Sequence, residues 1–102
     1  MTVIATSAAP RLERRQYDPT LLAPRSARRF VDDLLGRWGW DGARPTVALL
    51  TSELVTDALR QAPTCIALHV ELAGETVRVE VSDDPGLIAD AAAGRLERQV
   101  AR

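Results

Sequence analysis

The sequence predicts an α+β fold, a two-layer sandwich with helices on one face of a small antiparallel sheet. Two segments with apolar residues at helical spacing come first, from Ser26 to Trp38 and from Thr46 to Gln61. Two segments with strict apolar–polar alternation follow, Ile66 to Leu72 and Val77 to Val81, joined by the turn Ala73-Gly74-Glu75. Because helices and strands are grouped rather than alternating, the sheet is expected to be antiparallel.

Length and composition limit the domain organisation and the function classes. The chain has 102 residues, enough for one domain, and we expect residues 1–10 to be a disordered tail and residues 11–102 to form the domain. All 13 basic residues are arginine and the net charge is −1, so no global field favours nucleic acid or an acidic membrane. The absence of lysine excludes a Walker A phosphate loop and a Schiff base. No apolar run approaches a membrane span and the N-terminus is a poor signal peptide, so a cytoplasmic protein is expected.

The remaining elements are predicted from local signals. Residues 11–17 are expected to form an arginine-rich edge strand. Ser26 is the expected N-cap of the first helix and Gly39 its end, while Ala62-Pro63 stops the second helix. Residues 87–102 are expected to form a short amphipathic helix, since apolar residues recur there every four positions, at Ile88, Ala92, Leu96 and Val100.

Four single residues of uncommon type are interpreted in structural terms. Cys65 has no partner for an internal disulfide and is expected to be a small buried residue. The only histidine, His69, is expected to be partly exposed and to bind no metal. Trp38 and Trp40 are expected to close the end of the first helix over the core.

The second helix carries the pattern with the most chemical content. Glu53, Asp57 and Gln61 lie four residues apart and project from one face, beside an apolar stripe of Val47, Leu50, Leu54 and Ala58. Two like charges at this spacing destabilise a helix by roughly 0.2–0.5 kcal/mol unless they are neutralised. A divalent cation, the neighbouring Arg60 and a solvated acidic face are the three alternatives.

The segment ELVTDALRQA, residues 53–62, resembles the N box (E-x-x-x-N-A-x-x-H-A) of the Bergerat-fold or GHKL ATPases. It is most similar to the anti-sigma-factor serine kinases common in actinobacteria, although Asp57 replaces the family's Asn and Gln61 its His. The likeness extends over residues 11–87 and includes VEVSDDPG, which resembles the family motif V-x-V-x-D-D-x-P-G with one residue deleted. The resemblance implies a truncated histidine-kinase-like ATPase fold.

The resemblance also implies roles for particular residues, with ATP and Mg²⁺ as cofactors. Glu53 would activate the attacking hydroxyl or water, and Asp57 would be the Mg²⁺ ligand in place of the family's Asn. Asp83 would accept a hydrogen bond from the adenine amino group. The further nucleotide contacts would be Asp84, Gly86 and Gly94. Without a ligand, Asp83-Asp84-Pro85-Gly86 is equally explained as a turn.

Two functions of different classes follow from the resemblance. The first is an ATP-binding regulatory protein resembling anti-sigma-factor serine/threonine kinases, with weak or lost kinase activity because only Gly94 remains of the glycine-rich second box. The alternative is a non-catalytic module that binds a sigma factor or an antagonist through the first helix and an open sheet edge, which also favours a homodimer or an obligate partner. A helix-turn-helix is disfavoured, because the second helix is apolar or acidic over most of its length, and no nucleic-acid partner is expected.

Overall fold

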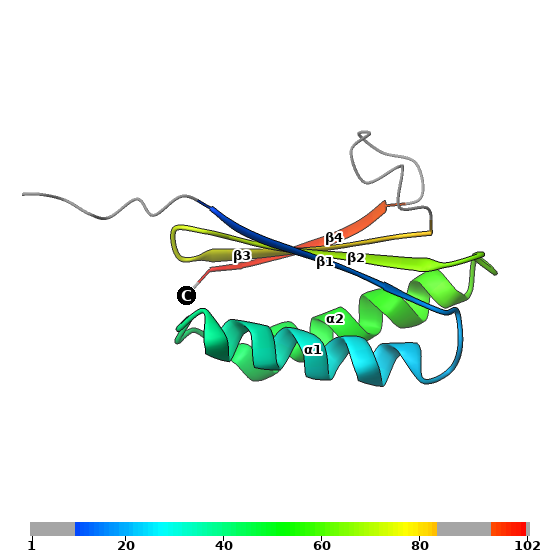
Figure 1. Cartoon of the computed structure of the whole chain (residues 1–102), viewed down its shortest axis with the longest axis horizontal. Coiled ribbons are helices and arrows are strands. Elements are labelled where there is room, and N and C mark those ends of the chain that lie inside the picture. Colours follow the sequence, from blue (N-terminus) through cyan, green and yellow to red (C-terminus); the bar gives the residue numbers. More distant parts are fainter. Residues whose placement is uncertain (1–9, 84–94, 102) are drawn as a thin grey trace, which may run out of the picture.

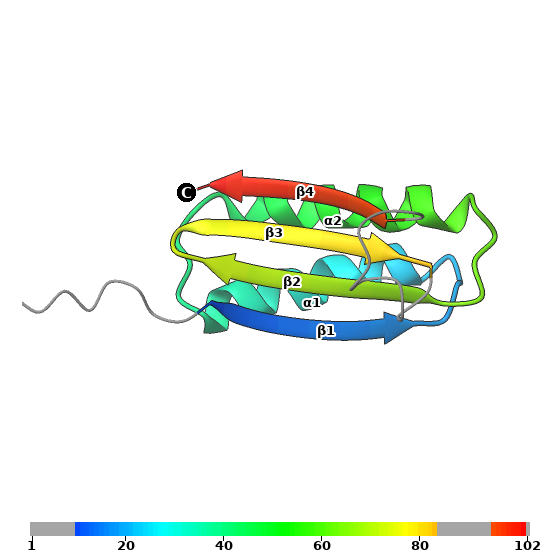
Figure 2. The same cartoon turned by 90° about the horizontal axis from the view of Figure 1, so that it is seen from above.

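Two helices cover one face of a four-stranded antiparallel sheet (Figures 1 and 2). This computed structural model describes residues 10–83 and 95–101. The elements in chain order are β1 (Arg11–Tyr17), α1 (Ala23–Arg37), α2 (Arg44–Leu59), β2 (Ile66–Ala73), β3 (Thr76–Ser82) and β4 (Arg95–Ala101). The strands lie in the order β1-β2-β3-β4, and every neighbouring pair is antiparallel. The predicted α+β two-layer sandwich is therefore confirmed, and no helix in the described part is long and apolar enough to cross a membrane.

The hairpin formed by β2 and β3 is confirmed with the predicted alternation. The register pairs Leu68 with Val81 and Val70 with Val79, and all four of these side chains are buried. Gly74 occupies the first position of the two-residue turn with a φ of +62°, a backbone conformation that glycine adopts without a steric penalty. The apolar residues of both strands therefore face the helices.

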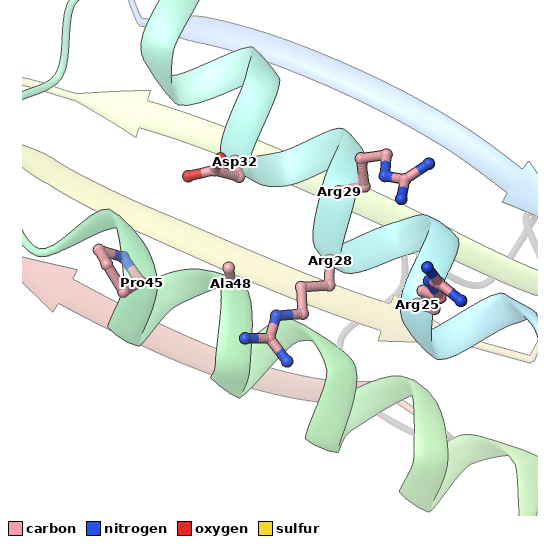
Figure 3. Close-up of a pocket in the computed structure, with 6 residues that line it drawn as sticks. All are labelled: Arg25, Arg28, Arg29, Asp32, Pro45 and Ala48. Atoms are coloured by element: carbon pink, nitrogen blue, oxygen red, sulfur yellow. The ribbon is translucent and has the colours of Figure 1, made fainter.

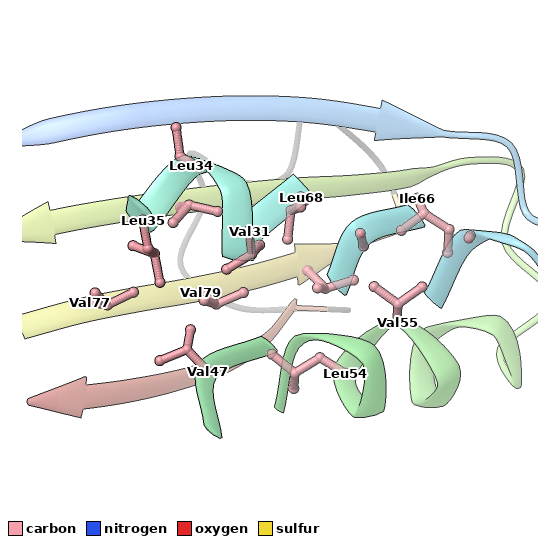
Figure 4. Close-up of a cluster of buried hydrophobic side chains, with 14 of the residues drawn as sticks. Val31, Leu34, Leu35, Val47, Leu54, Val55, Ile66, Leu68, Val77 and Val79 are labelled. Atoms are coloured by element: carbon pink, nitrogen blue, oxygen red, sulfur yellow. The ribbon is translucent and has the colours of Figure 1, made fainter. Parts of the chain in front are cut away.

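The hydrophobic core lies between this sheet face and the two helices (Figure 4). Its largest fully buried side chains come from both helices and both central strands: Val31, Leu34, Leu35, Val47, Val55, Ile66, Leu68, Val70, Val77, Val79 and Val81. β1, predicted as an edge strand, forms one edge of the sheet, where the Arg15 guanidinium lies 4.8 Å from the centre of the Phe30 ring.

The ends of α1 show one correct and one wrong prediction. Gly39 ends the helix as predicted: its φ is +72°, and Trp40 N–H donates to the Leu35 carbonyl, which is the long bond of a Schellman motif. Ser26 is not the N-cap. The helix begins at Ala23, with a proline in its first turn, and Ser26 N–H donates to the carbonyl of Leu22.

The predicted C-terminal helix is wrong over its described part. Residues 95–101 form β4 and pair with β3, while residues 87–94 lie outside the described ranges. The four-residue spacing of Leu96 and Val100 also fits a strand, since both positions then lie on one face. Pairing with β3 satisfies the backbone groups of what would otherwise be an open sheet edge.

The turn between the two helices is attached to the hairpin through Trp40. Its indole Nε1 donates a 2.9 Å hydrogen bond to the carbonyl of Glu75, and its ring is buried in the core cluster. Trp38 is partly buried against the same cluster, so the prediction for both tryptophans is confirmed. Gly42 packs against the Trp40 ring so closely that an added Cβ would lie 2.3 Å from it.

We expect Gly42→Ala to lower the free energy of unfolding by about 1–3 kcal/mol, because the new methyl group displaces the buried Trp40 ring. Gly36→Ala is the matched control. Its Cβ would meet the flexible end of Arg44, and alanine is the better helix former, so stability should change by about 1 kcal/mol or less. Urea denaturation measures the free energy of unfolding of both variants. Equal losses of stability in the two would contradict the packing of Gly42 against the Trp40 ring as the cause.

The sheet face opposite the helices carries a row of charged side chains. Arg78 bridges Glu71 at 3.0 Å and Glu80 at 3.2 Å, and Glu80 is only 2 % exposed. His69 lies in register between Arg14 of β1 and Glu80 of β3. Its predicted partial exposure is wrong: it is 7 % exposed, and neither ring nitrogen has a hydrogen-bond partner in the described part of the chain.

This environment predicts a pH-dependent stability. Burial lowers the pKa of His69, the charge of Glu80 opposes that shift, and Arg14 and Arg78 reinforce it. The unfolded chain therefore takes up the proton more readily, and the free energy of unfolding should fall as the pH drops below the unfolded value of about 6.5. Because His69 is the only histidine, His69→Leu should flatten the change between about pH 7 and pH 5. Urea denaturation of the wild type and the variant at both pH values measures this change in the free energy of unfolding. If the change is as large in the variant as in the wild type, His69 is not its cause.

Candidate functional site

The acidic face predicted for α2 is present. Glu53 and Asp57 are exposed on α2, whereas Leu54 and Ala58 are buried against the core. Gln61 is also exposed, but the helix ends at Leu59 and not at Gln61 as predicted, so Gln61 lies in the turn that follows. Val47 of the predicted apolar stripe is also buried, and Leu50 is half-buried. The pattern of the second helix therefore predicted which face is available to a ligand.

Glu53 and Asp57 line a shallow hollow of about 270 Å³ along this face, together with Ser52, Thr56 and Arg60. Arg60 Nη1 lies 3.2 Å from Asp57 Oδ1, and both side chains remain largely exposed. Of the three alternatives for balancing the acidic pair, the ion pair with Arg60 is the one that the structure shows. Such an exposed pair within one helix contributes only about 0.2–0.5 kcal/mol, so a ligand can displace it at little cost.

Asp83 follows β3 directly and is half-buried. Its backbone carbonyl lies 3.5 Å from Cys65 Sγ, which joins the end of β3 to the residue before β2. Cys65 itself is half-buried, less than was predicted. The C-terminal half of α2 and the end of β3 lie at the same end of the molecule (Figures 1 and 2).

The remaining predicted nucleotide contacts, Asp84, Gly86 and Gly94, lie outside the described residues. Within the described part, no group of three or more His, Cys, Asp or Glu side chains is arranged to hold a metal ion. Glu53 and Asp57 fit a less demanding site, since Mg²⁺ usually takes one or two carboxylates and completes its octahedron with phosphate oxygens and water.

A larger hollow, not predicted from the sequence, lies between α1 and α2 (Figure 3). It measures about 530 Å³, and its lining, which we call the arginine groove, consists of Arg25, Arg28, Arg29, Asp32, Pro45 and Ala48. The sequence carries one signal for this groove: three arginines lie in the first half of a helix that has no acidic residue in its first turn.

No known protein-family model matches the chain, and no curated protein sequence matches it significantly. The similarity of residues 53–62 to the N box therefore stays a prediction, together with the functions that it implies.

Proposed function

We propose that this chain is an ATP-binding regulatory protein of the anti-sigma-factor kinase type, with weak or lost kinase activity. One observation supports the proposal most. The two carboxylates of the N-box-like segment, Glu53 and Asp57, are exposed on the C-terminal half of α2, and Asp83, which resembles the adenine-binding aspartate, follows β3 at the same end of the molecule (Figure 1). An ATP-dependent regulator of this kind would act in the cytoplasm, where ATP is held.

Each of the three carboxylates has a distinct part in this proposal. Asp83 accepts a hydrogen bond from the adenine amino group, which fixes the orientation of the base. Asp57, once released from Arg60, would hold Mg²⁺, and the ion would supply positive charge against the phosphate groups. Glu53 is exposed beside it and accepts the proton of an attacking hydroxyl, if that hydroxyl lies within hydrogen-bond reach.

Two features support weak or lost activity. Small-molecule sites commonly enclose about 300–1,000 Å³, and the hollow beside Glu53 measures about 270 Å³. In addition, Asp57 places a negative charge beside Glu53 where the family has a neutral Asn. Both features reduce the affinity for a triphosphate in the absence of a cation.

The first test is a calorimetric titration of ATP, with and without Mg²⁺, into the wild type and Asp83→Asn. We expect Mg²⁺-dependent binding that weakens about tenfold or more in the variant, because the neutral amide oxygen of asparagine is a weaker acceptor for the adenine amino group than a carboxylate. Asp18→Asn is the matched control: it removes the same charge from an exposed loop position and should leave the affinity unchanged. Silence at millimolar ATP from a folded sample would refute nucleotide binding.

A second test concerns the replaced N-box residue. Asp57→Asn removes the negative charge beside the phosphates, so the ratio of ATP affinities with and without Mg²⁺ should fall relative to the wild type. The variant also loses the exposed ion pair with Arg60, but stability should drop by only about 0.5 kcal/mol or less. The same calorimetric titrations measure both affinities. An unchanged Mg²⁺ dependence would remove Asp57 from the site.

The alternative function, a non-catalytic module that binds a sigma factor or an antagonist protein, is favoured by a different observation. The larger hollow on the molecule is the arginine groove, which lies between the helices and includes none of the N-box carboxylates. A chain that has lost catalysis can retain such a surface. The two functions are compatible, because the two hollows share no residue.

A further inference from the structure

We infer that the arginine groove binds an acidic, amphipathic segment of a partner protein. This inference specifies the partner chemistry of the binding-module function and does not depend on ATP binding. It is carried by the charge of the groove, by the position of that charge on α1, and by the apolar surface beside it.

The groove has an excess of positive charge that the described residues do not neutralise. Arg25, Arg28 and Arg29 are exposed and form no ion pair with another residue in the described ranges, whereas the groove's one acid, Asp32, is bonded to Arg44 at 3.2 Å. On the other flank of α1, a hollow of about 390 Å³ shares Arg25 and Arg29. This second hollow adds Arg15 and Asp33, so four arginines and two aspartates line the two hollows together. The charge of their lining is thus +2 on a chain whose net charge is −1.

One of these arginines, Arg25, lies in the first turn of α1, where the isolated fold gains nothing from its charge. The N-terminal end of a helix carries a partial positive charge, so cationic side chains there are unfavourable. The first turn of α1 holds no acidic residue that would offset this repulsion. Carboxylates of a bound partner would interact favourably with the arginines and with the helix end together. We therefore expect the positive charge of this surface to be balanced by an anionic group of a partner molecule.

The apolar part of the groove identifies the class of anionic partner. Pro45 and Ala48 of α2 face the arginines of α1, and Arg28 extends across the groove toward α2 (Figure 3). A nucleic-acid backbone offers dense phosphate charge, which Asp32 and Asp33 would repel, and it has no apolar group for Pro45 and Ala48. An amphipathic helix with glutamates and leucines on adjacent faces matches both parts, as in helix-in-groove recognition.

The probe is a fluorescein-labelled peptide of about 20 residues, a length at which an isolated helix can form, with glutamates along one face and leucines beside them. Fluorescence anisotropy follows its binding at low and moderate salt, without nucleotide. We expect saturable binding that weakens as the salt concentration rises, because the contact is largely electrostatic. In the double variant Arg25→Gln/Arg28→Gln, the dissociation constant should rise about tenfold, since two charge contacts are lost.

Arg37→Gln is the matched control, since it removes an equally exposed arginine from the last turn of the same helix, outside the groove. Its dissociation constant should change less than about twofold. The double variant should melt at the same temperature as the wild type or higher, because the charge of Arg25 lies at the positive end of the helix and does not stabilise it. A lower melting temperature would instead indicate a structural role for Arg25. Three results would each overturn the inference: no saturable binding, an equal loss in Arg37→Gln, or equally tight binding of a peptide with serine for leucine or of single-stranded DNA of the same charge. The peptide titration contains no nucleotide, so its failure would refute the inference about the arginine groove alone. A failed ATP titration would refute nucleotide binding alone.

Discussion

The register between β2 and β3 is the constraint on which the rest of the structure depends. With Gly74 in the turn and Val70 opposite Val79, the valine, leucine and isoleucine side chains of the two central strands all face the helices. A slip of one residue would turn these side chains outward and bring Glu80 and His69 into the core. The hydrogen bond from Trp40 to the Glu75 carbonyl fastens the helical layer to this same hairpin.

This packing determines which surfaces remain for binding. α2 buries Leu54 and Ala58 against the sheet, so Glu53 and Asp57 face outward along one side. α1 packs beside α2 on the same sheet face, and the space between them on the outer side becomes the arginine groove (Figure 3). The two candidate sites therefore carry opposite charges on neighbouring surfaces of one helical layer. The proposed nucleotide site and the proposed protein-binding site share no lining residue, so occupation of one leaves the other accessible.

Much of the fold was predictable because its signals are local. Amphipathic spacing identified both helices, and alternation identified the hairpin. The C-terminal strand was not predictable, since the spacing of Leu96 and Val100 fits both periods and only pairing with β3 decides between them. For the site, helical periodicity predicted the exposure of Glu53 and Asp57. The groove was not predictable, because it depends on how the two helices pack against each other, which periodicity does not describe.

The placement of β1 has a kinetic consequence. Tyr17 pairs with Ile66 and Arg11 with Leu72, so this strand joins residues 49 to 61 positions apart, whereas the β2–β3 hairpin closes over two residues. Closing the longer loop costs more chain entropy, so the helix pair and the hairpin can assemble before β1 docks. On partial unfolding, β1 is correspondingly the strand that detaches first. Its departure would uncover the backbone of the apolar strand β2, and aggregation would begin along that newly opened edge.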